Sequence, residues 1–382
     1  MKLLFVLIPF LLAVILGRVI IPFIFLITFK KRLFDPIDAR KLHTNIIPRL
    51  GGVAFVPVQC CLLILTLMIT YKTNFTDLHI ATWEVFPMFI MLICGLVILF
   101  LIGIGDDLIG VGYKWKFVVQ IFVAALLPLS GLWINDLYGI FFITQIPAWI
   151  GMPFTVFLVV LIINAINLID GLDGLCSGLV GVCCLVLGGL FVYYAAWIHA
   201  LFAFITAGVL IPFFYYNVFG KRKRHRRIFM GDTGSMTLGF SVAFLAISFT
   251  MNNPNIKPFS EGAIVVAAAP LIVPVFDVAR VMLVRLLTGY SVFKPDRNHL
   301  HHKLLRSGMS HSTAMLSILG LSLFFCIVNI VGVQFISNNI VLLLDVILWG
   351  VITMVFNYIM NKKNKKRTKA VATVEELTPK EL

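Results

Sequence analysis

The chain of 382 residues is 60% hydrophobic and only 13% charged, with a mean hydropathy of +1.02 and a formal net charge of +14. A soluble domain is about a quarter charged, so these values exclude an ordinary water-soluble protein and indicate an integral membrane protein. The positive charge predicts attraction to anionic lipids and gives no reason to expect nucleic acid, because the basic residues form no domain interleaved with aromatic residues.

Apolar runs long enough to cross a bilayer recur from one end of the chain to the other. Runs of about 17 to 25 residues are typical of transmembrane helices, whereas barrel strands are shorter. The pattern therefore predicts an all-α polytopic membrane protein with about 11 transmembrane helices. The expected spans are 3–29, 51–71, 85–105, 117–134, 152–168, 174–195, 198–217, 234–251, 261–288, 312–333 and 338–360. Residues 1–360 form one membrane domain in this prediction, and the polar segment 361–382 is expected to be a disordered tail.

Lys and Arg collect in alternate loops, each following an odd-numbered span. These stretches are residues 30–49, 114–116, 221–227, 294–306 and 362–369. By the positive-inside rule they face the cytoplasm, so the N-terminus is predicted to lie outside and the C-terminus in the cytoplasm. The seven cysteines lie in or beside apolar runs without CxxC spacing, so neither disulfides nor zinc are expected.

Four polar motifs interrupt the apolar sequence, each at a predicted cytoplasmic end of a span. They are 103–110 with its Asp106-Asp107 pair, 164–175, 231–235 and 298–302. A carboxylate at the bilayer centre costs about 2.5 to 3.5 kcal/mol, so ionisable residues in such places usually mark a functional site. Lys and Arg set the topology, whereas Asp, Asn, Gly and His make up the motifs. Two independent signals therefore predict one site at the cytoplasmic face.

The residue types in these motifs favour metal-assisted phosphoryl transfer. The polar residues Asn164, Asn167, Asp170 and Asp173 recur at every third position, which places them on one face of a helix. The carboxylates of the motifs offer more negative charge than mutual repulsion allows without a cation, and they are Asp106, Asp107, Asp170, Asp173 and Asp232. Oxygen ligands suit Mg²⁺, or Mn²⁺ as an alternative. The groups able to hold phosphate oxygens are Arg49, Lys114, Lys116, Arg297, His299, His301 and His302.

Each motif taken alone also has a structural interpretation. The Asp106-Asp107 pair could be an ordinary turn at a helix C-terminus, and residues 231–235 could be a helix N-cap. The three histidines could form a metal trio, although a phosphate clamp is favoured in a basic loop without Cys. Asp277 and Arg280, three residues apart within a span, indicate a buried ion pair.

Two other classes of protein use similar residues. A cation-coupled transporter is the non-enzymatic alternative, but it would place its carboxylates near mid-membrane instead of at one surface. A CDP-alcohol phosphotransferase also uses aspartates and glycines at a membrane face. Its pattern fails here because Ser177 and Gly178 stand where Ala and Arg are required.

Taken together, the motifs resemble those of the polyprenyl-phosphate N-acetylhexosamine-1-phosphate transferases. The matching stretches are Pro48-Arg-Leu-Gly-Gly52, Gly105-Asp-Asp107 with Lys116 and Gln120, Asn164 to Leu175, Phe229 to Ser235, and Asp296 to His302. The resemblance is strongest to the bacterial branch that starts O-antigen, enterobacterial common antigen or wall teichoic acid synthesis. A phospho-N-acetylmuramoyl-pentapeptide-type transferase of the same family is the alternative, disfavoured by the eleventh span and the form of the last motif.

The resemblance implies a reaction and its partners. N-Acetylhexosamine 1-phosphate, with GlcNAc as the first candidate sugar, is transferred from a UDP-sugar to undecaprenyl phosphate with release of UMP. The setting it implies is the bacterial plasma membrane with the active site facing the cytoplasm, in lipopolysaccharide or cell wall synthesis. Direct attack by the lipid phosphate is favoured over a phosphorylated aspartate intermediate. A homodimer is usual among such enzymes.

The resemblance also implies roles for individual residues. Asp232 is the expected Mg²⁺ ligand with Asn167 nearby, and Asp106 and Asp107 are expected to position or deprotonate the lipid phosphate, which Lys116 binds. The other expected contacts are Asp170 and Asp173 with the nucleoside side of the donor, Phe229 with uracil, Asn164 as a further substrate-binding residue, and Arg297, His299, His301 and His302 with the pyrophosphate.

Overall fold

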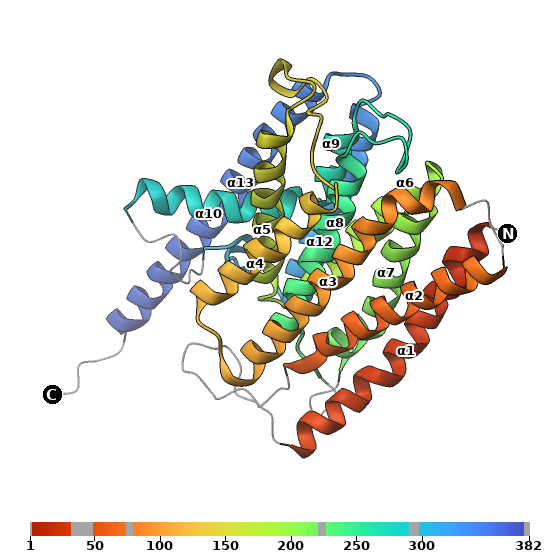
Figure 1. The fold of residues 1–382 in the computed structure, drawn as a ribbon. Helices are drawn as coiled ribbons and strands as arrows, with labels where there is room; N and C mark the ends of the chain where they lie inside the picture. The colour runs from red at the N-terminus through yellow and green to blue at the C-terminus, as the bar shows by residue number, and fades with distance from the viewer. Residues whose placement is uncertain (1, 32–48, 74–78, 221–226, 290–297, 378–382) are drawn as a thin grey trace.

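The computed structural model describes residues 2–31, 49–73, 79–220, 227–289 and 298–377, which form a bundle of helices (Figure 1). Its elements are α1 (Lys2–Lys30), η1 (Leu50–Ala54), α2 (Phe55–Thr73), α3 (His79–Ile109), α4 (Tyr113–Leu129), η2 (Ile140–Phe142), α5 (Ala148–Ile169), α6 (Leu175–Tyr193), α7 (Trp197–Phe219), α8 (Gly231–Thr250), α9 (Ala263–Ala268), η4 (Ala269–Leu271), α10 (Ile272–Leu287), α11 (Leu300–Arg306), α12 (His311–Gly332) and α13 (Asn338–Leu377). Within these described ranges the nearest approach to a sheet is one isolated bridge between Asp136 and Gln145. The all-α prediction is confirmed.

Ten helical stretches of the described chain are long and apolar enough to cross a membrane. The predicted span absent from these ten is α4, which has 17 residues and ends at Leu129, not at residue 134. It ends early because Gly131 adopts φ +87°, a left-handed conformation that a helix cannot continue through. The prediction of about 11 spans therefore corresponds to ten long helices and one shorter helix.

The ninth predicted span, 261–288, is interrupted. The chain forms α9, a 3₁₀ turn and then α10 instead of one continuous helix. Pro270 lies within the turn and Pro274 within the first turn of α10, and proline cannot donate the backbone hydrogen bond that a helix interior needs. The interruption separates α10, which carries Asp277, from the preceding segment.

The last helix continues beyond the predicted end of the membrane domain. α13 runs as far as Leu377, so residues 361–377, expected to be disordered, are helical. The segment is rich in Lys, Ala and Glu, which have high helix propensities, and it extends a helix that is already formed. A polar tail that follows a long span can therefore continue that span as a helix.

α8 lies at the centre of the bundle, where every residue from Thr233 to Thr250 is buried. It contacts α3, α5, α6 and α7, and Figure 1 shows it enclosed by its neighbours. Small residues along its length let other helices approach closely, which is the usual basis of helix association in membranes. Four of its hydroxyl groups bond to the helix's own carbonyls and can therefore be buried at low cost; they belong to Ser235, Thr237, Ser241 and Thr250.

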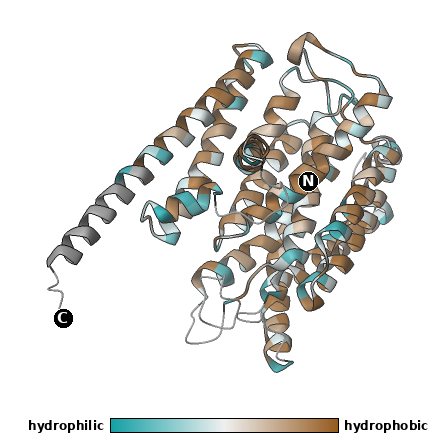
Figure 2. Cartoon of the chain, turned by 90° about the vertical axis from the view of Figure 1, so that its left-hand side faces the viewer, coloured by the Kyte–Doolittle hydropathy of each residue, from teal (hydrophilic) through white to brown (hydrophobic). Residues whose placement is uncertain are grey.

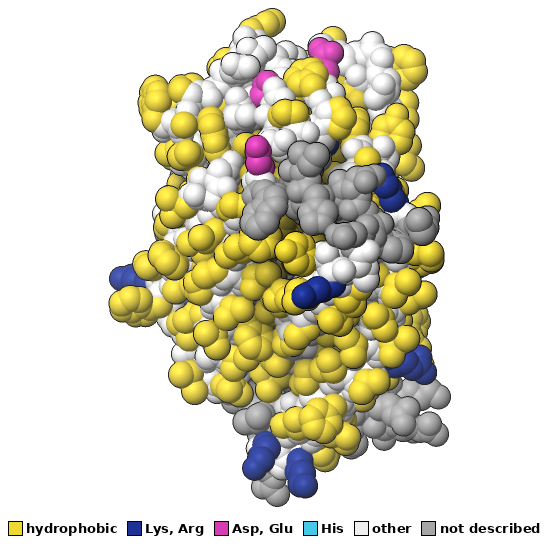
Figure 3. Space-filling model, turned by 45° about the vertical axis from the view of Figure 1, so that its right-hand side comes forward, with side chains coloured by type: hydrophobic (Ala, Val, Ile, Leu, Met, Phe, Trp, Pro, Cys, Tyr) yellow, Lys and Arg dark blue, Asp and Glu magenta, His cyan; other side chains and the backbone are white. Residues whose placement is uncertain are grey.

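The surface of the bundle suits a bilayer. Figure 2 shows that most of the helical length is hydrophobic and that hydrophilic residues gather mainly in the loops and near helix ends. On the face in Figure 3, hydrophobic side chains form a broad belt that includes a few separate basic side chains, with Asp and Glu toward the top and a pair of basic side chains at the bottom. The acidic side chains of this face therefore lie toward one end of the bundle.

Candidate active site

The N-terminus of α8 lies against the C-terminal end of α3. Asp107 Oδ1 accepts a hydrogen bond from the backbone N–H of Asp232 at 2.8 Å. Its Oδ2 accepts from the backbone N–H and the hydroxyl of Thr233, at 3.0 and 2.6 Å. A carboxylate here satisfies N–H groups that a helix leaves unpaired at its start, and the helix dipole favours it. Both oxygens of Asp107 thus hold the turn that carries Asp232.

Close backbone contacts explain the glycines of these motifs. A Cβ on Gly103 of α3 would lie 2.5 Å from the Cα of Thr233, and one on Gly52 would lie 2.3 Å from the Cα of Gly234. The segment around Gly52 also contacts the stretch that precedes α8, because the Gly52 N–H donates to the carbonyl of Met230 at 2.9 Å. Glycine at positions 52 and 103 therefore lets η1 and α3 meet the start of α8.

Lys116 joins two of the predicted catalytic carboxylates. Its Nζ lies 3.1 Å from Asp106 Oδ2 and 2.8 Å from Asp232 Oδ2. Asp106 also accepts a hydrogen bond from the backbone N–H of Val111 at 2.7 Å, which fixes its orientation. The three charged side chains are 14% to 30% exposed, so a ligand can reach them. The ends of α3, α4 and α8 thus converge on one charged cluster.

Two asparagines of α5 lie beside this cluster and have different partners. The amide nitrogen of Asn167 donates to the hydroxyl of Ser235 at 2.8 Å, and Asn167 also interacts with the carboxylate of Asp232. Asn164 instead donates to Gln120 Oε1 at 2.7 Å and to the carbonyl of Val160 at 2.8 Å. The hydrogen bonds of Asn164 connect α5 to α4, which gives it a packing role in addition to any contact with substrate.

The donor atoms near the start of α8 fit a magnesium ion. The described residues contain no group of three or more His, Cys, Asp and Glu side chains arranged around a metal position. Magnesium is commonly bound by one or two carboxylates together with phosphate oxygens and water, so it does not need such a group. Asp106 and Asp232 share the single ammonium of Lys116, which leaves an excess of negative charge for a cation to balance. The carboxylate of Asp232 would supply a hard oxygen ligand to such an ion, and Asn167 lies beside it.

The loop between α5 and α6 places two further carboxylates near the cluster. Burial raises the pKa of Asp170 well above its ordinary value, and the negative charges of Asp232 and Asp107 raise it further. Asp173 forms an ion pair with Arg227. The loop is held by Asn217 of α7, whose side-chain oxygen accepts from the Gly174 N–H at 2.6 Å. The predicted polar stripe is therefore divided between the end of α5 and this loop.

The basic run 221–227 is interpreted from the sequence as topological charge, with closure over the donor as the alternative, and most of it lies outside the described residues. Its last residue, Arg227, belongs to the site because it pairs with Asp173. Burial lowers the pKa of Arg227, which shows that this guanidinium is no ordinary surface charge. Phe229, two residues later, is half-buried, and its carbonyl accepts from the Gly51 N–H at 2.9 Å.

The histidine motif at the start of α11 is anchored to α10. His299 Nδ1 lies 2.9 Å from Asp277 Oδ2, and the backbone N–H of Leu300 lies 3.1 Å from both oxygens of that carboxylate. The rings of His301 and His302 are 4.2 Å apart. Arg297 lies outside the described residues. The predicted Asp277–Arg280 ion pair is confirmed at 2.7 Å, but the further contacts of Asp277 were not foreseen.

His301 connects the histidine motif to the aspartate loop. It is only 1% exposed, and a Cβ on Gly171 would lie 2.5 Å from its Nε2. Among the described residues neither ring nitrogen has a hydrogen-bond partner. Burial, with the neighbouring His302 and His299, lowers the pKa of His301 to about 3, so its ring is neutral near pH 7. Two buried nitrogens without partners mark a place where a polar ligand would be stabilised.

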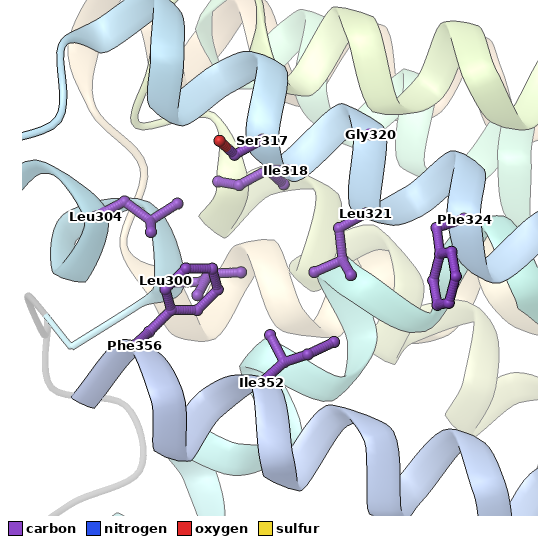
Figure 4. Close-up of a pocket in the computed structure, with 9 residues that line it drawn as sticks. All are labelled: Leu300, Leu304, Ser317, Ile318, Gly320, Leu321, Phe324, Ile352 and Phe356. Atoms are coloured by element: carbon purple, nitrogen blue, oxygen red, sulfur yellow. The ribbon is translucent and has the colours of Figure 1, made fainter. Parts of the chain in front are cut away.

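An apolar cavity of about 290 Å³ lies on another side of α11 (Figure 4). It is lined from α11, α12 and α13 by Leu300, Leu304, Ile318, Leu321, Phe324, Ile352 and Phe356, with Ser317 and Gly320 completing it. α11 is also tied to α13, because Lys303 Nζ donates to Asn357 Oδ1 at 2.8 Å. The short helix thus carries histidines toward the charged site and leucines toward an apolar space.

Comparisons with known proteins agree with this arrangement. Residues 89–250 match the glycosyl transferase family 4. A probable undecaprenyl-phosphate N-acetylglucosaminyl 1-phosphate transferase of Bacillus subtilis (strain 168) is 29% identical over 329 residues, 85% of this chain and 84% of that protein. An undecaprenyl-phosphate alpha-N-acetylglucosaminyl 1-phosphate transferase of Salmonella typhi is 30% identical over 302 residues, 78% of this chain and 76% of its own length. The protein of the same name from Escherichia coli (strain K12) is 26% identical over 291 residues. On this similarity, which spans most of both chains, the protein belongs to glycosyl transferase family 4.

Proposed function

We propose that this protein transfers N-acetylhexosamine 1-phosphate, with GlcNAc as the first candidate sugar, from a UDP-sugar to undecaprenyl phosphate and releases UMP. The observation that carries the proposal is the cluster of Asp106, Lys116 and Asp232, in which three helix ends bring carboxylates and an ammonium together. The names of the relatives support the acceptor and the sugar. An aqueous-facing charged cluster on an apolar bundle suits a reaction between a water-soluble donor and a lipid.

In this proposal, an oxygen of the lipid phosphate forms a bond to the phosphorus next to the sugar. The bond from that phosphorus to the oxygen of the leaving UMP breaks, so sugar phosphate passes to the lipid in one step. Lys116 would hold the lipid phosphate beside Asp106, which orients it or accepts its proton. A phosphorylated aspartate is the alternative route. Asp107 is poorly placed for that role, because both of its oxygens hold the start of α8.

The proposed metal residues are Asp232 and Asn167. Magnesium bound there would neutralise negative charge on the donor phosphates. The chain orients both residues through other contacts, because Asp107 holds the backbone of Asp232 and Ser235 accepts from the amide of Asn167. This support keeps the ligand oxygens in place before substrate arrives, as efficient phosphoryl transfer requires.

The remaining predicted residues would hold the donor. Asp170 and Asp173 are proposed to face its nucleoside, Phe229 its uracil, and the histidine motif with Arg297 its pyrophosphate. The contact between His301 and Gly171 supports this division, because it brings the histidine motif to the aspartate loop. By the positive-inside rule, we place the site on the cytoplasmic side of the bacterial plasma membrane. A homodimer is proposed from the resemblance alone.

The direct test is transfer from radiolabelled UDP-GlcNAc, and from a panel of other UDP-sugars, to undecaprenyl phosphate in detergent. The proposal predicts labelled lipid and stoichiometric UMP, both abolished by EDTA and restored by Mg²⁺. If the folded protein labels no lipid with any donor but moves cations in proteoliposomes, the transporter alternative replaces the proposal.

A further inference from the structure

Asp277 is a buried carboxylate that the proposed reaction does not use directly. It lies in α10 and is 1% exposed. Its Oδ2 lies 2.9 Å from His299 Nδ1, and its Oδ1 lies 2.7 Å from the guanidinium of Arg280. Arg280 in turn donates to the carbonyl of Asn298 at 2.6 Å. A single carboxylate and its arginine therefore hold three consecutive residues, 298–300, which lie 18 to 23 positions further along the chain.

The geometry determines which nitrogen of His299 can meet a ligand. A carboxylate only accepts hydrogen bonds, so Nδ1 must carry the proton in the contact with Asp277. Nε2 is then the ring atom left for a ligand. Nε2 donates to an anion when the ring carries a proton on both nitrogens, and the carboxylate at Nδ1 compensates the positive charge of such a ring. An imidazole oriented in this way is prepared for a phosphate group.

The charges around His299 are consistent with this role. Arg280 is the cation on α10 that faces the pair, and it neutralises Asp277 while the site is empty of anion. His301, stacked on His299 with ring centroids 6.0 Å apart, is neutral because burial lowers its pKa to about 3. His302 is adjacent to His301. Among the described residues, Asp277 is therefore the carboxylate in contact with His299.

We propose that Asp277 is a positioning residue that fixes the ring of His299 through Nδ1, so that Nε2 is directed to a phosphate of the donor. The identity of that phosphate rests on the proposed function, whereas the coupling between Asp277 and His299 does not. No covalent bond changes in this step.

The test is binding of UDP, which carries the donor's diphosphate without the sugar, measured by titration calorimetry. The variants are Asp277→Asn, His299→Gln and the double variant. Each single variant should raise the Kd about tenfold or more, the usual effect of losing a charge-assisted hydrogen bond. The double variant should bind no more weakly than His299→Gln, because coupled residues are not additive.

A matched control distinguishes this role from general damage to a membrane helix. Asp345 of α13 is also a buried carboxylate, bonded to Asn329 of α12 at 3.0 Å, and Asp345→Asn should leave the Kd unchanged. The proposal is overturned if the effects of Asp277→Asn and His299→Gln multiply in the double variant. It is also overturned if His299→Gln alone leaves UDP binding as in the parent, whatever the folding of the Asp277 variant. Transfer activity, assayed separately, reports on the proposed function.

Discussion

Adjacent aspartates at the end of α3 have different environments. Asp107 is bound by three donors at the start of α8, whereas Asp106 shares the ammonium of Lys116 with Asp232. Both were predicted to act on the lipid phosphate. Asp107 contributes to the site by fixing the position of Asp232, and Asp106 is the one of the pair that a substrate can approach through its contact with Lys116.

This difference predicts separate effects on stability and activity. Asp107→Ala should lower the free energy of unfolding by about 0.5 to 2 kcal/mol, the typical cost of a lost helix cap, and should abolish transfer. Asp106→Ala should abolish transfer while the thermal unfolding midpoint in detergent stays close to that of the parent. Equal midpoints for the two variants would contradict the capping role of Asp107.

Asp170 gives a prediction about pH. Because burial raises its pKa above the ordinary 3.8, the folded protein holds this proton more tightly than the unfolded chain. The resulting stability is complete below pH 3.8 and is lost as the pH rises through the folded pKa. Asp170→Asn should therefore be more stable than the parent in EDTA at about pH 8, with a smaller difference at about pH 5. A difference that grows as the pH falls would refute this sign.

Sequence reasoning at the residue scale singled out most of the residues that the structure brings together at the cluster but few of their partners. The carboxylates stood out because ionisable groups are rare in apolar spans, and Lys116 came from the family pattern. The bonds of Asp277 to His299 and of Asp173 to Arg227 join residues far apart in the chain, which no local pattern encodes. The sequence predicts an ion pair between Asp277 and Arg280. Its further contact with His299 could have been suspected only from the histidines that follow in the chain.

At the scale of elements, the site depends on how closely α3 approaches α8. The two helices meet where Gly103 faces Thr233, and the same crossing brings Asp107 to the start of α8. Gly320 in α12 has the opposite surroundings, because it lines the apolar cavity and a Cβ there would meet nothing within 4 Å. Glycine is thus required at the first position and is only tolerated at the second.

The same substitution at the two glycines should have opposite effects. Gly103→Ala should destabilise the protein by about 1 to 3 kcal/mol through overpacking, with loss of transfer because the cap on α8 is displaced. Gly320→Ala should stabilise it by about 1 kcal/mol, since alanine is the better helix former and meets no obstacle. Thermal unfolding in one detergent tests both. A stable, active Gly103→Ala variant would contradict the close crossing of α3 and α8.

Most elements were predicted to within a few residues, because a long apolar run defines a membrane helix almost by itself. The errors fall where backbone chemistry overrides hydropathy. α4 ends early because of Gly131. Pro270 and Pro274 lie where the ninth span is divided into α9, η4 and α10. α13 continues into a polar segment because residues that form helices well follow a helix already begun. Hydropathy alone predicts none of these three differences.

For the whole molecule, the unequal charge of the two ends predicts its orientation. Lys114 lies at the end that carries the charged site, whereas Phe142 in η2, 96% exposed, belongs to the loop between α4 and α5. In a background without the seven native cysteines, Phe142→Cys should react with a membrane-impermeant maleimide in intact cells and Lys114→Cys only after lysis. Labelling with the opposite preference would place the site outside and contradict the proposed donor, which is a cytoplasmic nucleotide sugar.

The most direct test of the whole account follows the phosphorus atoms of the donor. UDP-GlcNAc labelled at the phosphate next to the sugar is incubated with undecaprenyl phosphate, Mg²⁺ and the protein, with Asp232→Asn as the inactive comparison. The account predicts that this label passes to the lipid, that label in the uridine-side phosphate appears in UMP, and that Asp232→Asn transfers neither sugar nor phosphate. If the sugar reached the lipid while both phosphates stayed with the nucleotide, the reaction would be glycosyl transfer and the proposed attack on phosphorus would be wrong.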